Sequence, residues 1–264
     1  MIQEIKSRDN SLIKYVNKLK DNSFSKEEKK FIIEGIHLVE MAKNNLLYVL
    51  TEKKLDEKMY PNQYLVTKEI LEKLSNNKSS SSVIGICKFI DEKDDYDGDI
   101  LYLEDVQDPG NVGTLFRTAL AFNIKNIYVS EKTAYKYNLK VIQASQGSIF
   151  DLNIKILNIE DLIKLKEKQY KIITTSLSKN SVYLNDFKFD KNQKYIVILG
   201  NEGQGVSQIA LKEADIVLKI RMENIDSLNV AIAGGIILNS IYNKWFIIFF
   251  YKENDIILLS VEKK

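Results

Sequence analysis

The sequence predicts an α/β fold in which strands and helices alternate through two regions of the chain. Short apolar runs, which are typical of buried strands, recur along it, and segments with helical spacing of apolar residues separate them. The acidic segment DEKDDYDGD at 91–99 has no apolar run and interrupts this pattern. We therefore predict two domains, 1–92 and 100–245, joined by an acidic linker at 93–99.

In the first region, a helix is predicted at 11–20 because its apolar residues recur at helical spacing. Further helices are predicted at 36–44 and 68–74, and strands at 31–35, 48–52, 64–67 and 83–90. The serine-rich stretch at 75–83 indicates a loop. This alternation favours a small α/β domain.

In the second region, the run ILYLED at 100–105 predicts a strand buried on both faces, as in a parallel sheet. Further strands are predicted at 126–130, 151–156, 171–177, 195–200 and 215–220, and helices at 114–122 and 227–245. Parallel sheets bind ligands where the carboxyl ends of their strands open into loops, so we expect a site at that edge.

Cysteine and histidine are too scarce for several classes of chemistry. The single Cys87 excludes a disulfide framework and, with the single His37, a Cys/His metal site. A Ser-His-Asp triad would have to use that one histidine. No apolar leader follows Met1, and no apolar run is long enough to span a membrane. We therefore expect a cytoplasmic protein with no metal ion and no membrane contact.

The formal net charge of +2 hides an uneven distribution: residues 1–90 carry +4, 91–99 carry −5, and 100–264 carry +3. A mildly basic first region suits phosphate contact without specifying a nucleotide sequence. Only three of the 38 basic residues are arginines: Arg8, Arg117 and Arg221. In so lysine-rich a chain an arginine indicates a place that needs a guanidinium, although chance explains any one of them equally well.

The first of three loop motifs lies in LEDVQDPGNVGTLFRTALAFN, residues 103–123. Pro109 and Gly110 predict a turn after the strand, and Thr114 is a candidate N-cap for the helix that follows. Arg117 would then lie one helical turn in, where a guanidinium can bind phosphate through paired donors. An ordinary turn followed by an exposed helix arginine fits the same spacing.

The second motif, ILGNEGQGVS at 198–207, follows an apolar strand directly and has glycines on either side of Glu202. Backbone groups from Gly200 to Gly203 are therefore open to a ligand. The motif has neither the lysine of a P-loop nor GxGxxG spacing, which disfavours a nucleotide-phosphate cradle. A purely structural glycine loop fits as well.

The third motif is IRMENIDSLNVAIAGGIILN, residues 220–239. Ser227 and Asn229 stand at a helix start, where they can cap the helix or face a ligand. Ala231, Gly234 and Gly235 make one helix surface small enough for close packing against backbone or another subunit. A capped core helix explains the same residues, and both descriptions can hold together.

Taken together, the three motifs resemble those of the SpoU/TrmH family of RNA ribose 2′-O-methyltransferases, within the SPOUT superfamily. DPGNVGTLFRTALAF, GNEGQG and SLNVAIAGGIIL occur in the family's order, and the resemblance covers roughly residues 100–245. IKSRDNSLIKYVNKL and FIIEGIHLVEMA also resemble the substrate-binding domain that precedes the catalytic domain in many members. The resemblance thus implies a small α/β RNA-binding domain followed by a SPOUT domain.

The resemblance further implies a parallel sheet with a deep trefoil knot, and a homodimer that completes the site. It implies S-adenosylmethionine (AdoMet) as the methyl donor and RNA as the substrate, with rRNA favoured over tRNA. Carried over to this chain, the cofactor-binding residues are Ser176, Leu177, Leu199, Gly200, Asn201, Ile220 and Leu228.

By the same resemblance, the catalytic residues are Arg117, Asn111, Glu202, Ser227 and Asn229. An arginine is a poor proton acceptor because its pKa exceeds about 12. We therefore assign phosphate binding and polarisation of the 2′-hydroxyl to Arg117 and leave the first acceptor of the proton open. The other four residues would hold the loops and orient the ribose, and no metal ion is required.

Two features depart from the family pattern. Members commonly have IPM before the third motif, where this chain has Ile220, Arg221 and Met222, and the ENID loop that follows lacks the usual glycine. The apolar segment 246–264 lies beyond the family's usual end, and its β-prone sequence indicates a hairpin or an aggregation-prone extension.

Two other functions compete with methyl transfer. A catalytically silent RNA-binding or ribosome-assembly protein would have the same fold, but the intact set of predicted catalytic residues argues against it. A dinucleotide or NTP enzyme on a doubly wound sheet would need fingerprints that are missing here. Binding of AdoMet rather than NAD or ATP would distinguish these functions.

Overall fold

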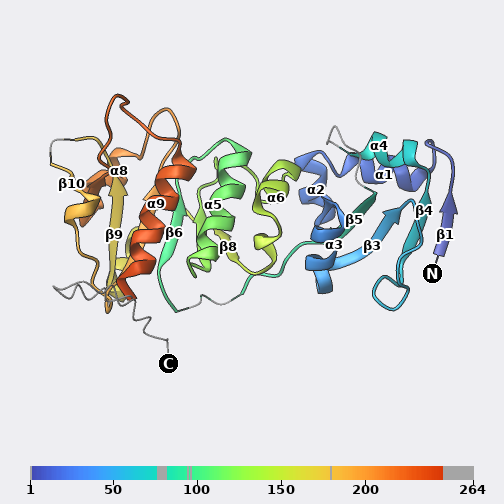
Figure 1. Ribbon diagram of the computed structural model, residues 1–264, viewed down its shortest axis with the longest axis horizontal. Helices are drawn as coiled ribbons and strands as arrows, with labels where there is room; N and C mark the ends of the chain where they lie inside the picture. Colours follow the sequence, from blue (N-terminus) through green and yellow to red (C-terminus); the bar gives the residue numbers. More distant parts are fainter. Residues whose placement is uncertain (1, 76–81, 94, 96, 179, 246–264) are drawn as a thin grey trace, which may run out of the picture. The chain divides into compact units, whose positions relative to one another are not determined.

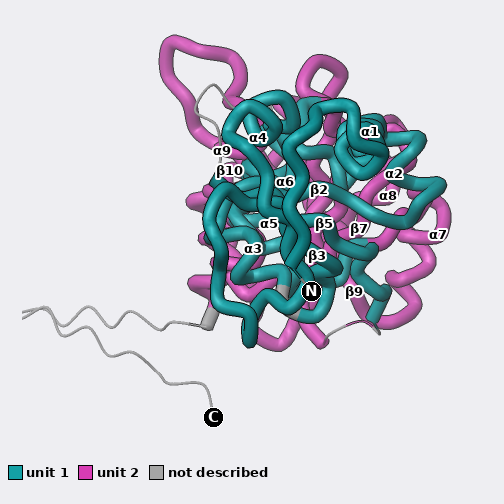
Figure 2. Tube along the Cα trace, turned by 90° about the vertical axis from the view of Figure 1, so that its right-hand side faces the viewer, with its two compact units in different colours: residues 1–94, 108–117, 134–154 teal, residues 95–107, 118–133, 155–264 magenta. Residues whose placement is uncertain are grey.

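The computed structural model describes residues 2–75, 82–93, 95, 97–178 and 180–245, so the predicted extension at 246–264 and most of the predicted loop at 75–83 lie outside these ranges. The chain forms two sheets and divides into two compact units (Figures 1 and 2). Unit 1 comprises Met1–Asp94, Asp108–Arg117 and Ala134–Ile154, and unit 2 comprises Asp95–Gln107, Thr118–Thr133 and Lys155–Lys264. The boundaries predicted at 92/93 and 99/100 stay predictions.

The first sheet has five strands in the order β1-β4-β3-β5-β2. They are β1 (Ile2–Ile5), β2 (Lys30–Glu34), β3 (Leu46–Thr51), β4 (Gln63–Val66) and β5 (Val83–Lys88). The β1–β4 and β3–β4 pairs are parallel, whereas β5 runs antiparallel to β2 and β3, so the sheet is mixed. The four strands predicted here are confirmed with small shifts at their ends. The sequence does not predict β1, because its two central residues are polar.

Four short helices accompany this sheet: α1 (Ser11–Lys18), α2 (Asn22–Glu28), α3 (Ile36–Ala42) and α4 (Lys68–Leu74), with a 3₁₀ turn, η1 (Lys43–Asn45). Apolar residues of α1 and α4 form one core with the strands, which includes Ile13, Val16, Ile70, Leu74, Leu50 and Ile84. The unpredicted α2 begins at Asp21, whose carboxylate accepts hydrogen bonds from the N–H groups of Ser23 and Phe24. Asp21 is therefore the N-cap of α2, a role that aspartate fills well.

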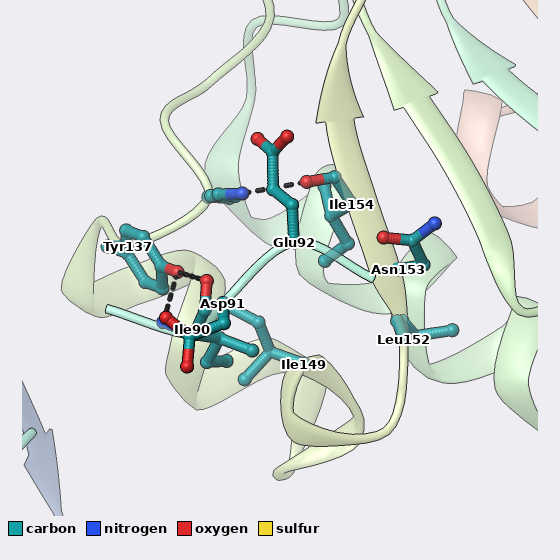
Figure 3. Close-up of a pocket in the computed structure, with 9 residues that line it drawn as sticks. Ile90, Asp91, Glu92, Tyr137, Ile149, Leu152, Asn153 and Ile154 are labelled. Carbon is teal, nitrogen blue, oxygen red and sulfur yellow. Dashed lines mark hydrogen bonds between the residues drawn. The ribbon is translucent and has the colours of Figure 1, made fainter. Parts of the chain in front are cut away.

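Aromatic stacking within unit 1 joins the first sheet to a segment of the second half of the sequence. The ring of Tyr137 stacks on both Phe31 and Phe89, with centroid distances of 4.4 and 4.3 Å. Figure 3 shows the Tyr137 hydroxyl against Ile90, whose N–H donates to it at 2.8 Å. The cavity beside these residues, about 10 Å³, holds at most one water molecule and is no ligand site. This packing places the segment Ala134–Ile154 in unit 1, although the segment is distant in sequence from the first sheet.

The second sheet has seven strands in the order β10-β12-β9-β11-β6-β7-β8. They are β6 (Ile100–Leu103), β7 (Asn126–Val129), β8 (Asn153–Ile156), β9 (Tyr170–Thr175), β10 (Val182–Tyr183), β11 (Lys194–Leu199) and β12 (Ile216–Lys219). Every pairing from β10 through β7 is parallel, which confirms the predicted parallel sheet. The sequence does not predict β10, which has only two residues.

The helices that follow β6 in the chain are α5 (Pro109–Ala121), α6 (Leu139–Ser145), α7 (Ile159–Ile163), α8 (Gln208–Glu213) and α9 (Val230–Tyr242), with 3₁₀ turns η2 (Ser148–Phe150), η3 (Lys164–Lys168), η4 (Leu184–Asp186) and η5 (Asn243–Trp245). Leu162 of α7 and Ala210 of α8 share a core with Ile172, Ile196 and Ile198, which alternate along the central strands. The helix α9 packs against the C-terminal part of α5 and the residue after it: a Cβ at Gly235 would meet Thr118 Cγ2 at 3.6 Å, and the rings of Tyr242 and Phe122 are 5.8 Å apart. Along β11 the apolar residues that point to either face of the sheet are buried, which agrees with the apolar runs that predict strands buried on both faces.

The helix predicted at 114–122 begins earlier, at Pro109, so the predicted turn at Pro109 and Gly110 and the predicted cap Thr114 are wrong. The Asp108 carboxylate accepts a hydrogen bond from the N–H of Asn111 at 2.8 Å, and its carbonyl accepts one from Val112 at 3.1 Å. Proline is well tolerated at the first helical position because the N–H that it lacks would have no partner there. Asp108 is thus the residue that starts the helix.

Three aspartates of the predicted linker are ion-paired with lysines of unit 2. Asp95 pairs with Lys155 at 3.0 Å, Asp97 pairs with Lys194, and Asp99 pairs with Lys244 at 2.8 Å. The last pair is buried: the Lys244 side chain is 2% exposed, and its ammonium also donates to the carbonyl of Gln193. The acidic segment is therefore anchored to the second sheet as well as linking the two sheets.

We predict that Lys244→Ala lowers the free energy of unfolding by about 3–5 kcal/mol, because it leaves the Asp99 carboxylate buried without its cation. Lys164 is the matched control, since its pair with Asp161 is solvent-exposed. Lys164→Ala should cost less than about 1 kcal/mol. Urea unfolding monitored by circular dichroism measures both values, and equal small losses would contradict a structural role for the buried pair.

Candidate functional site

The loop 200–206 at the carboxyl end of β11 folds back on itself because Gly200 has no side chain. A Cβ atom at Gly200 would lie 2.3 Å from the backbone C and O atoms of Gly205. Asn201 and Gly205 exchange two backbone hydrogen bonds of 2.9 Å, which close the loop. Gly205 has a φ of +70°, a conformation that favours glycine. The glycines thus allow a tight closed loop at the edge where ligands are expected.

Two side chains of the loop tie it to the segment after β6. The Asn201 amide donates to the carbonyl of Asp105 at 2.9 Å, and its oxygen accepts from the N–H groups of Gly203 and Gln204. The Glu202 carboxylate accepts from the N–H of Gln107 at 3.2 Å. Gln107 directly precedes the Asp108 cap of α5. Side chains of the second motif therefore bind backbone groups of the first motif at Asp105 and Gln107.

A cavity of about 630 Å³ opens between this loop, the end of β9 and the segment that joins β12 to α9. All seven predicted cofactor-binding residues line it: Ser176, Leu177, Leu199, Gly200, Asn201, Ile220 and Leu228. Three predicted catalytic residues, Glu202, Ser227 and Asn229, line it too. The fold therefore brings together residues from three separate sequence segments, while the role of each stays a prediction.

The third motif begins α9 as the sequence predicts. The Asn229 side-chain oxygen accepts from the N–H groups of Ala231 and Ile232, at 2.9 and 3.3 Å, so Asn229 is the N-cap. Ser227 is exposed at the cavity and lies two residues before the cap. Asn229 therefore orders the backbone that surrounds Leu228, and Ser227 presents a hydroxyl.

The remaining predicted catalytic residues, Asn111 and Arg117, lie on α5 and are not among the residues that line this cavity. Together with Thr114 they follow an inclined stripe on the helix, because each is three residues from the next. Asn111 is partly buried in the first turn, whereas Arg117 and Thr114 are exposed. Arg117 therefore presents its guanidinium to solvent.

A second cavity, of about 650 Å³, shares the wall formed by loop 200–206. Carboxylates dominate the charged groups around it, from Glu104, Asp105, Glu131, Glu160 and Asp161. Burial raises the pKa of the Tyr102 phenol there, which stays protonated and donates to the carbonyl of Leu157 at 3.1 Å. This acidic lining is less suited to an anionic ligand than the first cavity.

Sequence reasoning missed several residues of the site. The cavity is also lined by Thr175, Gln208, Leu211, Lys219, Met222, Asp226 and Ala233. Asp108 could have been found, because aspartate before proline is a standard helix start. Lys219 is the last residue of β12 and directly precedes the predicted cofactor-binding residue Ile220, but no motif singled it out.

Two properties of the described residues bear on other classes of function. These residues contain no group of three or more His, Cys, Asp or Glu side chains placed to hold a metal ion. Among the helices of the described ranges, none has the length and apolarity that a membrane span requires.

Comparison with known families gives two matches. The model of the SpoU rRNA Methylase family matches residues 99–239, and that of the MRM3-like substrate binding domain matches residues 10–85. Among curated proteins, the chain is 28% identical to 23S rRNA (guanosine(2553)-2′-O)-methyltransferase RlmP of Bacillus subtilis, over 90% of this chain and 98% of that protein. It is 32% identical to an uncharacterized tRNA/rRNA methyltransferase of Mycoplasma genitalium, over 74% of each.

Solved structures with the same fold include an AdoMet-bound rRNA methyltransferase from Sinorhizobium meliloti. Its TM-score is 0.83 and its identity 24%, over 92% of this chain and 98% of that one. The SpoU methyltransferase AviRb from Streptomyces viridochromogenes, in complex with AdoMet, has a TM-score of 0.77 at 19% identity, over 89% of this chain and 98% of that one. These likenesses extend over both sheets of the present chain.

We predict that Gly200→Ala weakens AdoMet binding at least about tenfold, which corresponds to about 1.4 kcal/mol, because loop 200–206 cannot close around a methyl group. Gly203 is the matched control in the same loop: a Cβ there would meet only the Asn201 side-chain oxygen, at 3.6 Å. Isothermal titration calorimetry gives both dissociation constants. Wild-type affinity in Gly200→Ala, or equal losses in both variants, would refute the steric argument.

Proposed function

Because the chain belongs to the SpoU rRNA methylase family, we propose that it transfers a methyl group from AdoMet to a ribose 2′-hydroxyl of ribosomal RNA. The family resemblance inferred from the three motifs is confirmed by the match over residues 99–239. The single observation that carries the proposal is the cavity at loop 200–206, where the second and third motifs meet the end of β9.

The cavity fits a cofactor of the size and chemistry of AdoMet. Its volume of about 630 Å³ lies within the range of about 300–1,000 Å³ that small-molecule sites occupy. Leu199, Leu228 and Met222 offer apolar surface for a base, and Gly200 leaves backbone groups uncovered by a side chain. When bound, AdoMet supplies an electrophilic methyl group on a sulfonium leaving group.

The chain's own contribution is positioning, which supplies much of the rate when the leaving group is already good. Glu202 fixes the backbone of Gln107, so the cofactor loop and the segment that follows β6 are held together. Asn229 fixes the first turn of α9. Ser227, with its side chain exposed at the cavity, would face the ribose.

Arg117 would bind the phosphate next to the target nucleotide and polarise the 2′-hydroxyl. Its exposed position on α5 leaves the planar guanidinium open to a phosphate, which it can bind through two parallel donors. A guanidinium keeps its proton at neutral pH, so it stabilises negative charge on the attacking oxygen rather than removing the proton.

The proposed substrate is RNA of the large ribosomal subunit rather than tRNA. The Bacillus subtilis relative is named for a guanosine of 23S rRNA, and it matches the present chain over both sheets. The match of residues 10–85 to a substrate binding domain supports a role of the first sheet and its helices in RNA capture. An rRNA substrate is consistent with the cytoplasmic location predicted from the sequence.

A homodimer through α9 is part of the proposal. Ile232 and Ile236 are four residues apart on α9 and are 57% and 38% exposed, so they form an apolar strip on the helix surface. Self-complementary apolar strips of this kind are typical of twofold interfaces. We also retain the deep trefoil knot as a proposal, since loop 200–206 and the segment joining β12 to α9 line the same cavity.

We predict that Arg117→Ala lowers kcat for methyl transfer by about 10²–10³-fold, because a preorganised donor to the developing oxyanion is lost. The assay is transfer of tritiated methyl from AdoMet to an unmodified transcript of the 23S rRNA segment around guanosine 2553, the nucleotide named for the Bacillus subtilis relative. Calorimetry should give an unchanged dissociation constant for AdoMet, since Arg117 does not line the cavity.

Arg117→Lys keeps the charge but loses the paired donors, and it should recover only part of the rate. Full activity in Arg117→Ala would refute the role of the arginine. A wild type that binds RNA but not AdoMet would instead favour the catalytically silent RNA-binding protein.

We predict that Ile232→Asp, combined with Ile236→Asp, converts the protein from dimer to monomer, because burying two carboxylates in an apolar interface is unfavourable. Met59→Asp is the control, since Met59 is also an exposed apolar residue but belongs to unit 1. Light scattering after size-exclusion chromatography measures the molar mass. A wild-type monomer, or a double variant that stays dimeric, would rule out this interface.

A further inference from the structure

Two cations share one aromatic ring at the edge of the second sheet. The Lys219 ammonium lies 4.4 Å, and the Arg221 guanidinium carbon 4.7 Å, from the centroid of the Tyr183 ring. The register explains this arrangement: Tyr183 of β10 pairs directly with Lys219 of β12, and Arg221 follows two residues later. Because β10 is the outermost strand, the trio lies at the border of the sheet.

Neither cation is neutralised within the described part of the chain. Lys219 and Arg221 form no ion pair with a described carboxylate, although many other lysines of the chain do. Since both lie within 5 Å of one centroid, the two charges are less than about 10 Å apart. Each cation gains only about 0.5–1 kcal/mol from an exposed aromatic ring. Their mutual repulsion is of similar size and would be relieved by an anion between them.

The trio lies at the rim of the cavity rather than inside it. Lys219 lines the cavity together with its neighbours Ile220 and Met222, whereas Arg221 and Tyr183 do not line it. Arg221 is exposed, and the Tyr183 side chain is 36% exposed. An anion held by both cations would therefore lie at the rim, beside the cofactor cavity.

We propose that Lys219 and Arg221, held by the Tyr183 ring, bind a backbone phosphate of the substrate RNA at a nucleotide flanking the methylated one. This inference rests on the proposed function, because the RNA strand must pass the rim to bring a ribose to the cofactor. A phosphodiester has the charge and the geometry that a guanidinium and an ammonium bind together. It also accounts for Arg221, an arginine at a position where the family pattern has proline.

The test is the salt dependence of RNA binding. Fluorescence anisotropy with a labelled transcript of the 23S rRNA segment around guanosine 2553 gives Kd for wild type and Arg221→Ala between 50 and 200 mM KCl. Loss of one phosphate contact should weaken binding several-fold and lower the slope of log K against log salt by about 0.7–0.9. The AdoMet dissociation constant and kcat at saturating RNA should not change.

Tyr183 provides a second variant that leaves both cations in place. Tyr183→Leu removes the ring that holds them and should have the effect of Arg221→Ala, whereas Tyr183→Phe keeps the ring and should behave as wild type. Lys168→Ala is the control for loss of a surface charge, because Lys168 precedes β9 and so lies at the amino ends of the parallel strands, whereas Lys219 lies at the carboxyl end of β12. Circular dichroism and Tm verify that each variant is folded.

Three results would overturn the inference: an unchanged salt slope in Arg221→Ala, an equal change in Lys168→Ala, or a wild type that does not bind the transcript. Weaker AdoMet binding in Arg221→Ala would assign the cations to the cofactor instead and would also overturn it. Failure of the proposed function is a separate result, since methyl transfer by wild type is measured in a different assay from the salt slope.

Discussion

The candidate site depends on one steric constraint, the absence of room for a side chain at Gly200. With a Cβ atom 2.3 Å from the backbone of Gly205, the chain could not return on itself directly after β11. Because it does return, Asn201 can bond to the carbonyl of Asp105 while Glu202 bonds to the N–H of Gln107. A single glycine thus couples the loop that lines the cavity to the segment that begins α5, and the chemistry that we propose requires both.

Much of the second sheet was predictable because its strands are continuous apolar runs between helical segments. The site was predictable for a different reason: parallel strands place their carboxyl ends at one edge, so loops that are distant in sequence meet there. All seven predicted cofactor-binding residues line one cavity for this reason. Their identity, however, came from the family resemblance and not from spacing.

Other features could not be predicted from the sequence, and each has a physical reason. Pro109 followed by Gly110 predicts a turn, but a proline is also compatible with the first turn of a helix once Asp108 supplies the cap. The strand β10 is too short to carry a pattern, and without it neither Tyr183 nor the cation pair could be placed. The aspartates at 95, 97 and 99 looked like a solvated linker, yet each has a lysine partner that is distant in sequence. Long-range charge pairing of this kind leaves no local signal.

Methyl transfer to a ribose 2′-hydroxyl is measured most directly by the position of the transferred methyl group in the RNA. Purified wild-type protein, AdoMet and unmodified 23S rRNA are incubated, and the RNA is then cleaved with alkali, which requires a free 2′-hydroxyl at each step. We predict one new alkali-resistant linkage that is absent without AdoMet. Methylation found on a base, or no resistant linkage at any position, would contradict it.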